Sequence, residues 1–240
     1  NFADGRHLAV SAETRLPEGV EQGAIPGLYK KYGILYLFGT EEDLKELIEL
    51  CHSRNVKLIL DLAINHTSSQ HPWFQQFKEA RMNGDAENPY YDFYSCVTTA
   101  EKVGGRTYQK IAGVDCWFEC NFSSDMPELN YDNPAVRQAM VDVAKFYLDM
   151  GIDGFRFDAV KYIYYGDTQR SVDFWLWYME ELKKINPEIY TVAEVWDGDG
   201  VTGVYYPATN CFNFTVSQVE GLLAETAKQG NAGEYTKYVE

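Results

Sequence analysis

Two charged side chains interrupt the otherwise strand-like segment GIDGFRFDAVKY, which runs from Gly151 to Tyr162. Arg156 and Asp158 stand two residues apart among apolar neighbours. Because side chains alternate across a strand, this arginine and this aspartate share one face. A nearby positive charge favours the ionised form of a carboxyl group. The segment therefore offers an anionic carboxylate that its neighbouring arginine keeps charged and in place.

Two other apolar segments also carry polar residues at their ends. In LDLAINH, Asp61 and Asn65 share a face and His66 ends the segment. In YTVAEVW, Glu194 shares a face with Trp196. A buried ion pair readily explains one such group, but three segments that each end in polar groups indicate a common site.

Glycoside hydrolysis is the chemistry that uses two carboxyl groups at one site. In a retaining enzyme they lie about 5–5.5 Å apart; one attacks the sugar, and the other donates and then accepts a proton. We predict Asp158 as the nucleophile, because Arg156 keeps it ionised. We predict Glu194 as the acid/base, because an apolar setting beside Val195 and Trp196 raises a carboxyl pKa. A carboxyl separation above about 10 Å would exclude this reaction.

The three segments need strands that end at one edge of a sheet. The sequence predicts strands at 56–65, 152–160, 188–196 and 210–215, parallel and adjacent in that order. Each is apolar throughout, which is typical of a parallel sheet covered by helices. A doubly wound sheet would be favoured by a Gly-rich phosphate loop after its first strand, and none is present. Charged groups at the carboxyl ends of the strands favour a (β/α) barrel, whose active sites lie there.

Helix signals alternate with these strands. Thr40 is expected to cap the first helix, and Asn133 the second, with Pro134 at its first position. Ser171 is expected to cap the third helix, and residues 217–229 to form a fourth.

We divide the chain into an atypical N-terminal segment (1–39), a partial barrel (40–66 and 132–240) and an inserted subdomain (67–131). A full eight-unit barrel takes about 250 residues, and about 175 remain here without the insert. The predicted fold is therefore an incomplete TIM barrel with a subdomain inserted after the strand that ends in His66. Its open sheet edges predict a homo-oligomer that covers them.

Composition narrows the class of ligand. A net charge of −15 and a pI near 4.7 argue against nucleic acid, which requires clustered Lys and Arg. No apolar run approaches the roughly 18 residues of a membrane span. The 15% aromatic content fits either core packing or flat faces for sugar rings.

The five cysteines leave the compartment open. The spacing of Cys116 and Cys120 fits either a disulfide or half of a metal site, but no second Cys/His pair follows at zinc-finger spacing, so the sequence leaves the disulfide state open. No signal peptide is present in the chain, and we favour a secreted or cell-surface location over the cytoplasm.

Four short blocks carry a family resemblance. DLAINH, MPELN, GFRFDAVKY and AEVW follow one another in this order, with a long insert after the first. Together they resemble the conserved blocks of the α-amylase family, glycoside hydrolase family 13, and MPELN is similar to the block of its neopullulanase and oligo-glucosidase branches. The resemblance covers roughly residues 38–215. It implies a truncated or divergent member that acts on α-glucans such as starch and malto-oligosaccharides.

The resemblance also implies roles for single residues. Asp158 matches the nucleophile, Glu194 the acid/base, and Arg156 the arginine that positions the nucleophile. His66 matches the histidine that binds the sugar at the cleavage point. No organic cofactor is implied.

Further matches concern substrate and metal. Lys161 and Tyr162 match a Lys-His pair on the leaving-group side, and Trp196 is a further candidate for substrate binding. Asn65 matches an asparagine that ligates a structural calcium in many amylases. Tyr162 departs from the usual His, and Glu128 from the Asp usual in its block.

Another departure leaves the function open. The family's third acid belongs to a block ending in His-Asp, and these 240 residues contain no such block. One alternative is therefore a non-catalytic carbohydrate-binding or interaction relic. Another is an unrelated metal-dependent barrel enzyme with Asp61, Asp158 and Glu194 as ligands, which Arg156 disfavours because it would repel a divalent cation.

Overall fold

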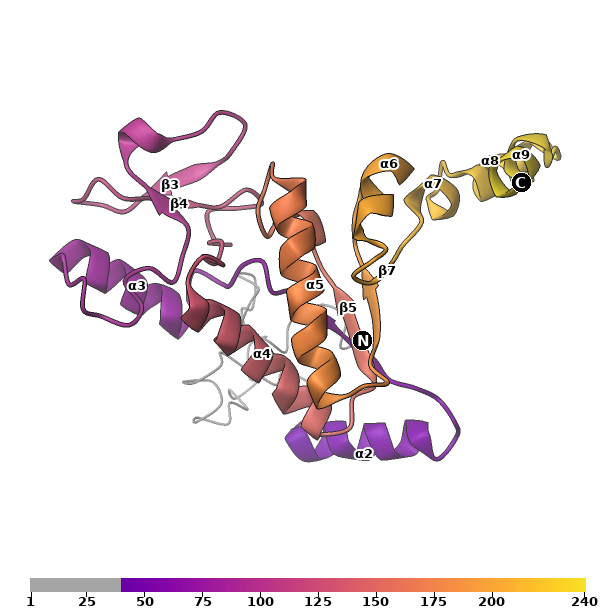
Figure 1. Cartoon of the computed structure of the whole chain (residues 1–240), viewed down its shortest axis with the longest axis horizontal. Helices are drawn as coiled ribbons and strands as arrows, with labels where there is room; N and C mark the ends of the chain where they lie inside the picture. Colours follow the sequence, from indigo (N-terminus) through magenta and orange to yellow (C-terminus); the bar gives the residue numbers. More distant parts are fainter. Residues whose placement is uncertain (1–39) are drawn as a thin grey trace, which may run out of the picture.

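A parallel sheet of four strands forms the centre of the computed structural model, which describes residues 40–240 (Figure 1). The strands are β1 (Ile59–Leu62), β5 (Gly154–Phe157), β6 (Tyr190–Ala193) and β7 (Asn210–Cys211), hydrogen-bonded in that order. The predicted order and direction are confirmed, and in the described part of the chain the sheet does not close into a barrel. The segment predicted for residues 1–39 lies outside the described residues.

The strands are shorter than predicted. The chain leaves β5 through Ala159, whose φ of 52° is left-handed, and enters the 3₁₀ helix η3 (Val160–Tyr162). At β7 the predicted six-residue strand is two residues long. Asn213 ends it, because its side chain accepts a hydrogen bond from Val216 N (3.1 Å) and caps the short helix α7 (Phe214–Ser217).

Three long helices accompany the sheet: α2 (Glu41–His52), α4 (Pro134–Asp149) and α5 (Thr168–Ile185). The predicted caps of α2 and α4 are confirmed: Thr40 accepts from the Asp43 amide (3.2 Å), and Asn133 accepts from the Ala135 amide (2.9 Å). Helices α4 and α5 pack side by side (Figure 1).

Two helix predictions were wrong in detail. Helix α5 begins three residues before Ser171, because Asp167 provides the cap by accepting from the Arg170 amide (3.1 Å). Ser171 is buried in the first turn instead. The helix predicted at 217–229 is α8 (Leu222–Gln229), which follows α7 after a break at Gly221. The remaining short elements are α6 (Asp199–Thr202), η4 (Gly203–Tyr205) and α9 (Gly233–Val239).

The region predicted as an insert carries its own small sheet. After α3 (Pro72–Asn83) come β2 (Cys96–Val97), η2 (Thr99–Glu101), β3 (Tyr108–Lys110) and β4 (Trp117–Glu119), with an antiparallel strand order β2-β4-β3. The division at 67 and 131 remains a prediction.

The structure contains a disulfide in this region, where the sequence had left the cysteine pairing open. Cys96 and Cys116 form the disulfide, whereas Cys120 is a buried free thiol. Cys116 and Cys120 flank the extended strand β4. Four residues of strand span about 13 Å, beyond the roughly 7 Å that the Cα atoms of a disulfide allow.

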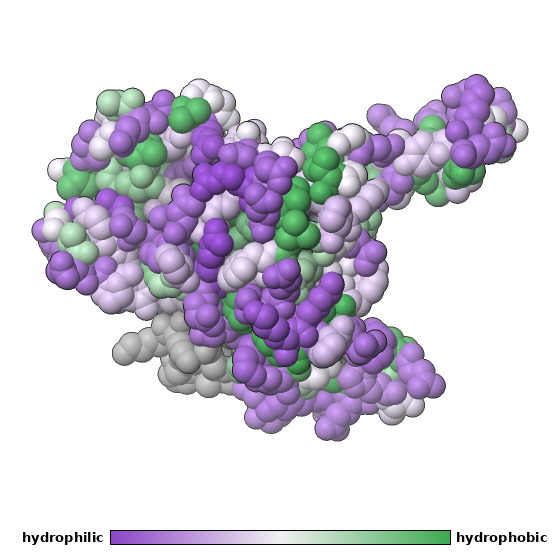
Figure 2. All heavy atoms as spheres, viewed as in Figure 1, coloured by the Kyte–Doolittle hydropathy of each residue, from purple (hydrophilic) through white to green (hydrophobic). Residues whose placement is uncertain are grey.

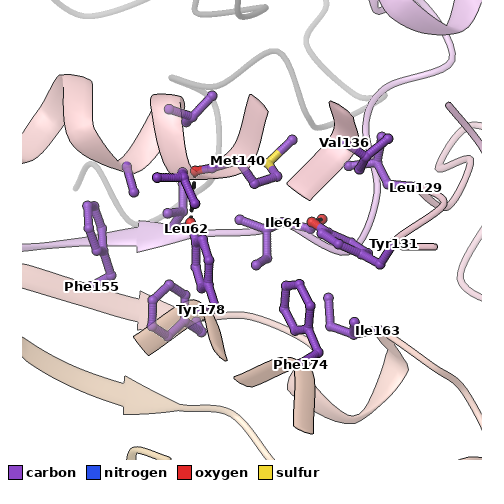
Figure 3. Packing of buried hydrophobic residues seen from close by; sticks show 14 of the residues in the cluster. Leu62, Ile64, Leu129, Tyr131, Val136, Met140, Phe155, Ile163, Phe174 and Tyr178 are labelled. Atoms are coloured by element: carbon purple, nitrogen blue, oxygen red, sulfur yellow. Dashed lines mark hydrogen bonds between the residues drawn. The ribbon is translucent and has the colours of Figure 1, made fainter. Parts of the chain in front are cut away.

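The core lies between the sheet and helices α4 and α5. Figure 3 shows Leu62 of β1 and Phe155 of β5 packed towards Tyr178 of α5 and Met140 of α4. The Tyr178 hydroxyl donates to the Met140 carbonyl (2.9 Å), so the buried aromatic residue leaves no phenol unpaired. This packing fixes the sheet and the ends of its strands.

The outer face seen in Figure 2 is largely hydrophilic, including the surface of α2, as the net charge of −15 leads one to expect. Among the described residues, no helix is both long and apolar enough to cross a membrane.

Gly154 allows β5 and β6 to approach, and this generates a stability prediction. A Cβ atom added to Gly154 would lie 1.7 Å from the Tyr190 carbonyl oxygen. We expect Gly154→Ala to lower the free energy of unfolding by about 3 kcal/mol or more, above the usual range for overpacking because backbone must move. Urea denaturation measures this. Gly104→Ala is the matched control, because a Cβ there meets nothing within 4 Å. Equal midpoints for the two variants would contradict the close approach.

Candidate active site

One guanidinium group gathers three carboxylates at the carboxyl end of the sheet. Arg156 Nη1 donates to both oxygens of Asp61 (2.8 and 3.0 Å) and to Asp158 Oδ1 (2.5 Å). Its Nη2 atom lies 3.0 Å from Glu194 Oε2. Because both catalytic candidates touch one planar group, their carboxyl groups lie well inside the limit of about 10 Å set above.

The register of the sheet produces this arrangement. Asp61 on β1 is the cross-strand partner of Arg156 on β5, so their side chains emerge side by side. Asp158 and Glu194 follow directly after β5 and β6. The Glu194 amide donates to the Phe157 carbonyl (2.8 Å), which extends the parallel pairing and sets Glu194 beside Asp158.

The protonation of Glu194 follows from its surroundings. Burial raises the pKa of its carboxyl group, and the charge of Asp158 and a hydrogen bond with it raise the pKa further, whereas Arg156 lowers it. Of the two apolar neighbours predicted to surround Glu194, only one is buried beside it. Val195 is fully buried, but Trp196 is 62% exposed and turns away to stack on Phe214.

Asp61 is neither a catalytic candidate nor a metal ligand here. Burial raises the pKa of its carboxyl group, and the hydrogen bond from Arg156 opposes that rise. The guanidinium binds all three carboxylates, which argues against the metal-enzyme alternative. Between residues 40 and 240, no group of three or more His, Cys, Asp and Glu side chains is arranged to hold a metal ion.

His66 lies buried at the end of the segment that follows β1. Burial lowers the pKa of its imidazole, although Asp158 opposes this, so a neutral ring is favoured. Its Nδ1 atom is buried without a hydrogen-bond partner among the described residues. The ring of Phe122 lies 5.6 Å from it, centroid to centroid. A neutral imidazole next to an aromatic face is suited to an uncharged hydroxylated ligand.

Asn65 does not assemble a calcium site in the described part of the chain. The side chain is buried and its Nδ2 atom has no partner there, while its backbone carbonyl accepts from the Leu129 amide (3.0 Å). Calcium requires six to eight oxygen ligands, and no cluster of acidic side chains converges there in residues 40–240. Calcium at Asn65 stays a prediction.

The structure places the other predicted binding residues around the rim. Lys161 Nζ donates to the Trp196 carbonyl (2.8 Å) and to Asp197 (3.0 Å), which joins η3 to the segment after β6. The ring of Tyr162 stacks on Tyr165 (4.8 Å) and also contacts Phe122 (4.5 Å). Tyr165 stacks on one face of the Tyr162 ring, and Phe122 meets that ring at a tilt of 52°.

Trp196 borders a pocket on the surface. Together with Phe214 it lines an open pocket of about 470 Å³, whose polar lining includes Asp197, Thr215 and Gln218. Stacked aromatic faces beside polar groups are suited to binding a sugar ring.

Sequence reasoning missed the residues that support the site from the inserted region. Phe122 lies four residues before the MPELN block, and no sequence signal distinguishes it. Glu128 is buried, and burial, with the charge of Glu119, raises its pKa to about 7. Asn121 Nδ2 donates to Glu119 (2.7 Å) and to Glu128 (2.9 Å). The sequence signal for Glu128 was that a Glu stands where this block usually has an Asp.

Comparison with known proteins settles the family. The family model of the α-amylase catalytic domain matches residues 30–234. The chain belongs to the α-amylase family. It is 39% identical over 198 residues to α-amylase 3 of Dictyoglomus thermophilum, covering 82% of this chain and 38% of that protein. A trehalose synthase/amylase of Mycolicibacterium smegmatis is 42% identical over 145 residues, or 55% of this chain and 23% of that one.

Solved structures agree on the architecture. Amy13B of Eubacterium rectale superposes with a TM-score of 0.75 at 31% identity, over 86% of this chain and 42% of its own. The chain thus spans about two fifths of the length of relatives such as this one and the Dictyoglomus amylase.

The coupling of the two carboxyl groups yields a direct prediction. Asp158→Asn removes the charge that helps to raise the Glu194 pKa, so the Glu194 pKa should fall. Carboxyl ¹³C NMR titration measures it, with the signal assigned from Glu194→Gln. Asp149→Asn removes an equal charge from an exposed pair with Lys145 and should change nothing. An unchanged Glu194 midpoint in Asp158→Asn would show that the two groups are independent.

Proposed function

We propose that this chain carries the catalytic pair of a retaining glycoside hydrolase that acts on α-glucans. The observation that supports this most strongly is the single guanidinium of Arg156, which holds the carboxyl groups of both Asp158 and Glu194. The raised pKa of Glu194 adds to it, because an acid catalyst must keep its proton at working pH.

The reaction proceeds in two steps. The Asp158 carboxylate attacks the anomeric carbon, and the Glu194 carboxylic acid protonates the departing glycosidic oxygen. A covalent glycosyl–Asp158 ester results, and Glu194 is left as a carboxylate. Glu194 then takes a proton from water as the water oxygen attacks the anomeric carbon, and Asp158 leaves as a carboxylate. Both groups end in their starting protonation states.

The role of Arg156 is electrostatic. It stays charged throughout, and its hydrogen bond to Asp158 holds the attacking carboxyl group in place. When Glu194 loses its proton to the leaving group, the same guanidinium stabilises the new anion. Each half-reaction therefore ends with a negative charge already facing Arg156.

Substrate binding falls to neutral and aromatic groups. His66 offers an uncharged imidazole beside Asp158, with Phe122 next to it. Lys161, the Tyr162 hydroxyl and Trp196 would meet the leaving-group side. The α-glucan is argued from the family, and the likeness to a trehalose synthase/amylase leaves transfer as an alternative to hydrolysis.

A non-catalytic relic is the second candidate. These 240 residues contain no His-Asp block to supply the family's third acid, which helps stabilise the charged transition state. We therefore expect weak or no turnover of starch by this chain alone, with glucan binding retained through His66, Arg156 and nearby aromatic residues.

Two substitutions test the catalytic pair. Asp158→Asn is nearly isosteric but cannot act as an attacking anion, so hydrolysis of malto-oligosaccharides should be abolished while the thermal melting curve is kept. Hydrolysis that survives Asp158→Asn would overturn the assignment. Robust hydrolysis by the unmutated chain that is lost in this variant would remove the relic from consideration.

Glu194→Gln should affect substrates unequally. It removes the proton donor, so turnover of malto-oligosaccharides should fall about 10²–10⁴-fold. The loss should be smaller for a nitrophenyl glucoside, whose leaving group needs little protonation. Turnover by the unmutated chain should fall as pH rises through the raised Glu194 pKa, because the acid form is then lost. Equal losses on both substrates would argue against Glu194 as the acid.

Self-association is proposed from the sheet. Its four described strands leave two edges, and unpaired edges recruit other strands. We expect light scattering to show a homo-oligomer at micromolar concentration. A compact monomer would contradict this proposal. The Cys96–Cys116 disulfide supports the proposal of a secreted or cell-surface location, because disulfides persist in oxidising compartments.

A further inference from the structure

Arg106 joins the inserted region to the turn that follows η3. It lies between η2 and β3, and its Nη1 atom donates to both oxygens of Glu119 on β4 (3.3 and 3.1 Å). Its Nη2 atom donates to the backbone carbonyl of Tyr165. That carbonyl belongs to residues 163–166, the turn between η3 and α5. One planar side chain therefore ties together two parts of the chain that lie 59 residues apart in sequence.

The ring of Tyr165 extends this contact towards the candidate active site. It stacks on Tyr162, with the ring centroids 4.8 Å apart and the planes inclined by 9°. Tyr162 in turn meets Phe122 of the inserted region at 4.5 Å, and Phe122 lies 5.6 Å from the ring of His66. The inserted region thus contacts the turn at its backbone, through Arg106, and contacts the ring of Tyr162 through Phe122.

The chemistry of arginine suits this task. Its donors lie in one rigid plane, so a bond to one nitrogen fixes the direction of the others. Glu119 holds Nη1, and the guanidinium therefore presents Nη2 to the Tyr165 carbonyl in a set direction. A hydrogen bond from a charged donor is also stronger than one between neutral groups. Arg106 can accordingly determine where the turn lies.

We propose that Arg106 is a positioning residue, which fixes the 163–166 turn against the inserted region and so sets the place of the Tyr162 ring. It does not touch the sugar. Its meaning for specificity rests on the proposed function: a glucan longer than the sugar at the nucleophile passes Tyr162, so Arg106 affects the binding of oligosaccharides and not of glucose. The place of the Tyr162 ring can be measured without any turnover.

Charge compensation alone is the alternative. Glu119 is 5% exposed, and in the described part of the chain Arg106 is the one cation paired with it. Loss of Arg106 would then leave a buried carboxylate unpaired and weaken the whole fold, without a particular effect on Tyr162. The two roles differ once residue 119 carries no charge, because no carboxylate then needs a partner.

Fluorine NMR of the whole chain labelled with fluorotyrosine separates the two roles, with the signals assigned from Tyr162→Phe and Tyr165→Phe. In Arg106→Gln we expect both signals to shift and broaden, because the turn loses its contact with the inserted region. Arg81→Gln is the matched control. It removes another partly buried arginine of the inserted region, one that pairs with Asp92, and should leave both signals unchanged.

The double variant Arg106→Gln with Glu119→Gln removes the buried charge together with its partner. Positioning predicts that the Tyr162 signal stays displaced, whereas charge compensation predicts its return to the unmutated position. That return, or an unmoved Tyr162 signal in folded Arg106→Gln, would overturn the proposal. If no Arg106 variant folds, Tyr165→Ala decides, because it keeps the carbonyl that Arg106 binds and removes the ring. A displaced Tyr162 signal then supports the proposal, and an unmoved one overturns it.

Sugar binding gives a second readout, measured by calorimetry in Asp158→Asn so that nothing is hydrolysed. Adding Arg106→Gln should raise the Kd for maltotriose by up to about tenfold, the range of one aromatic contact, and leave the Kd for glucose unchanged. An unchanged Kd for maltotriose, or an equal change for both sugars, would overturn the role in specificity. Absence of maltotriose binding would count against the proposed function, while the Tyr162 signal would still decide the role of Arg106.

Discussion

One cation faces three anions at the end of this sheet, and the candidate site depends on that imbalance. The guanidinium of Arg156 binds Asp61, Asp158 and Glu194 within 3.0 Å. A single positive charge cannot fully compensate three partly buried carboxylates, so holding one proton among them is favourable. Glu194 is the catalytic carboxyl group whose pKa rises, because burial and the neighbouring Asp158 act together on it. Under the proposed function, an acid and a nucleophile thus arise from two similar side chains.

The register of the parallel strands brings Arg156 and the three carboxylates together. Parallel strands β1, β5 and β6 end at one edge, and the pairing of Asp61 with Arg156 is set by the hydrogen bonds of the sheet. Gly154 permits the close approach of β6, which brings Glu194 beside the end of β5. The core of aromatic side chains from α5 then holds these strands in place.

The sequence predicted the parts of the site that depend on local pattern. The two-residue spacing of Arg156 and Asp158, and the apolar strands that carry them, require only the alternation of side chains. The strand order was also predicted correctly. The partnership of Asp61 with Arg156 was not, because it depends on a register between segments 95 residues apart. For the same reason the sequence left the partner of Cys116 open, which is Cys96 in the structure. It also placed Trp196 beside Glu194, whereas Trp196 stacks on Phe214.

The central claim is that Asp158 attacks the sugar. Incubation with a fluorinated α-glucosyl fluoride, whose good leaving group needs little acid catalysis and whose ring fluorine slows breakdown of the ester, should trap the glycosyl–enzyme intermediate. Mass spectrometry of the digested chain should then find one added fluoroglucosyl group on the peptide that contains Asp158, and none in Asp158→Asn. A label on Glu194 or on another carboxylate would contradict the account, whereas no label after prolonged incubation would favour the non-catalytic relic.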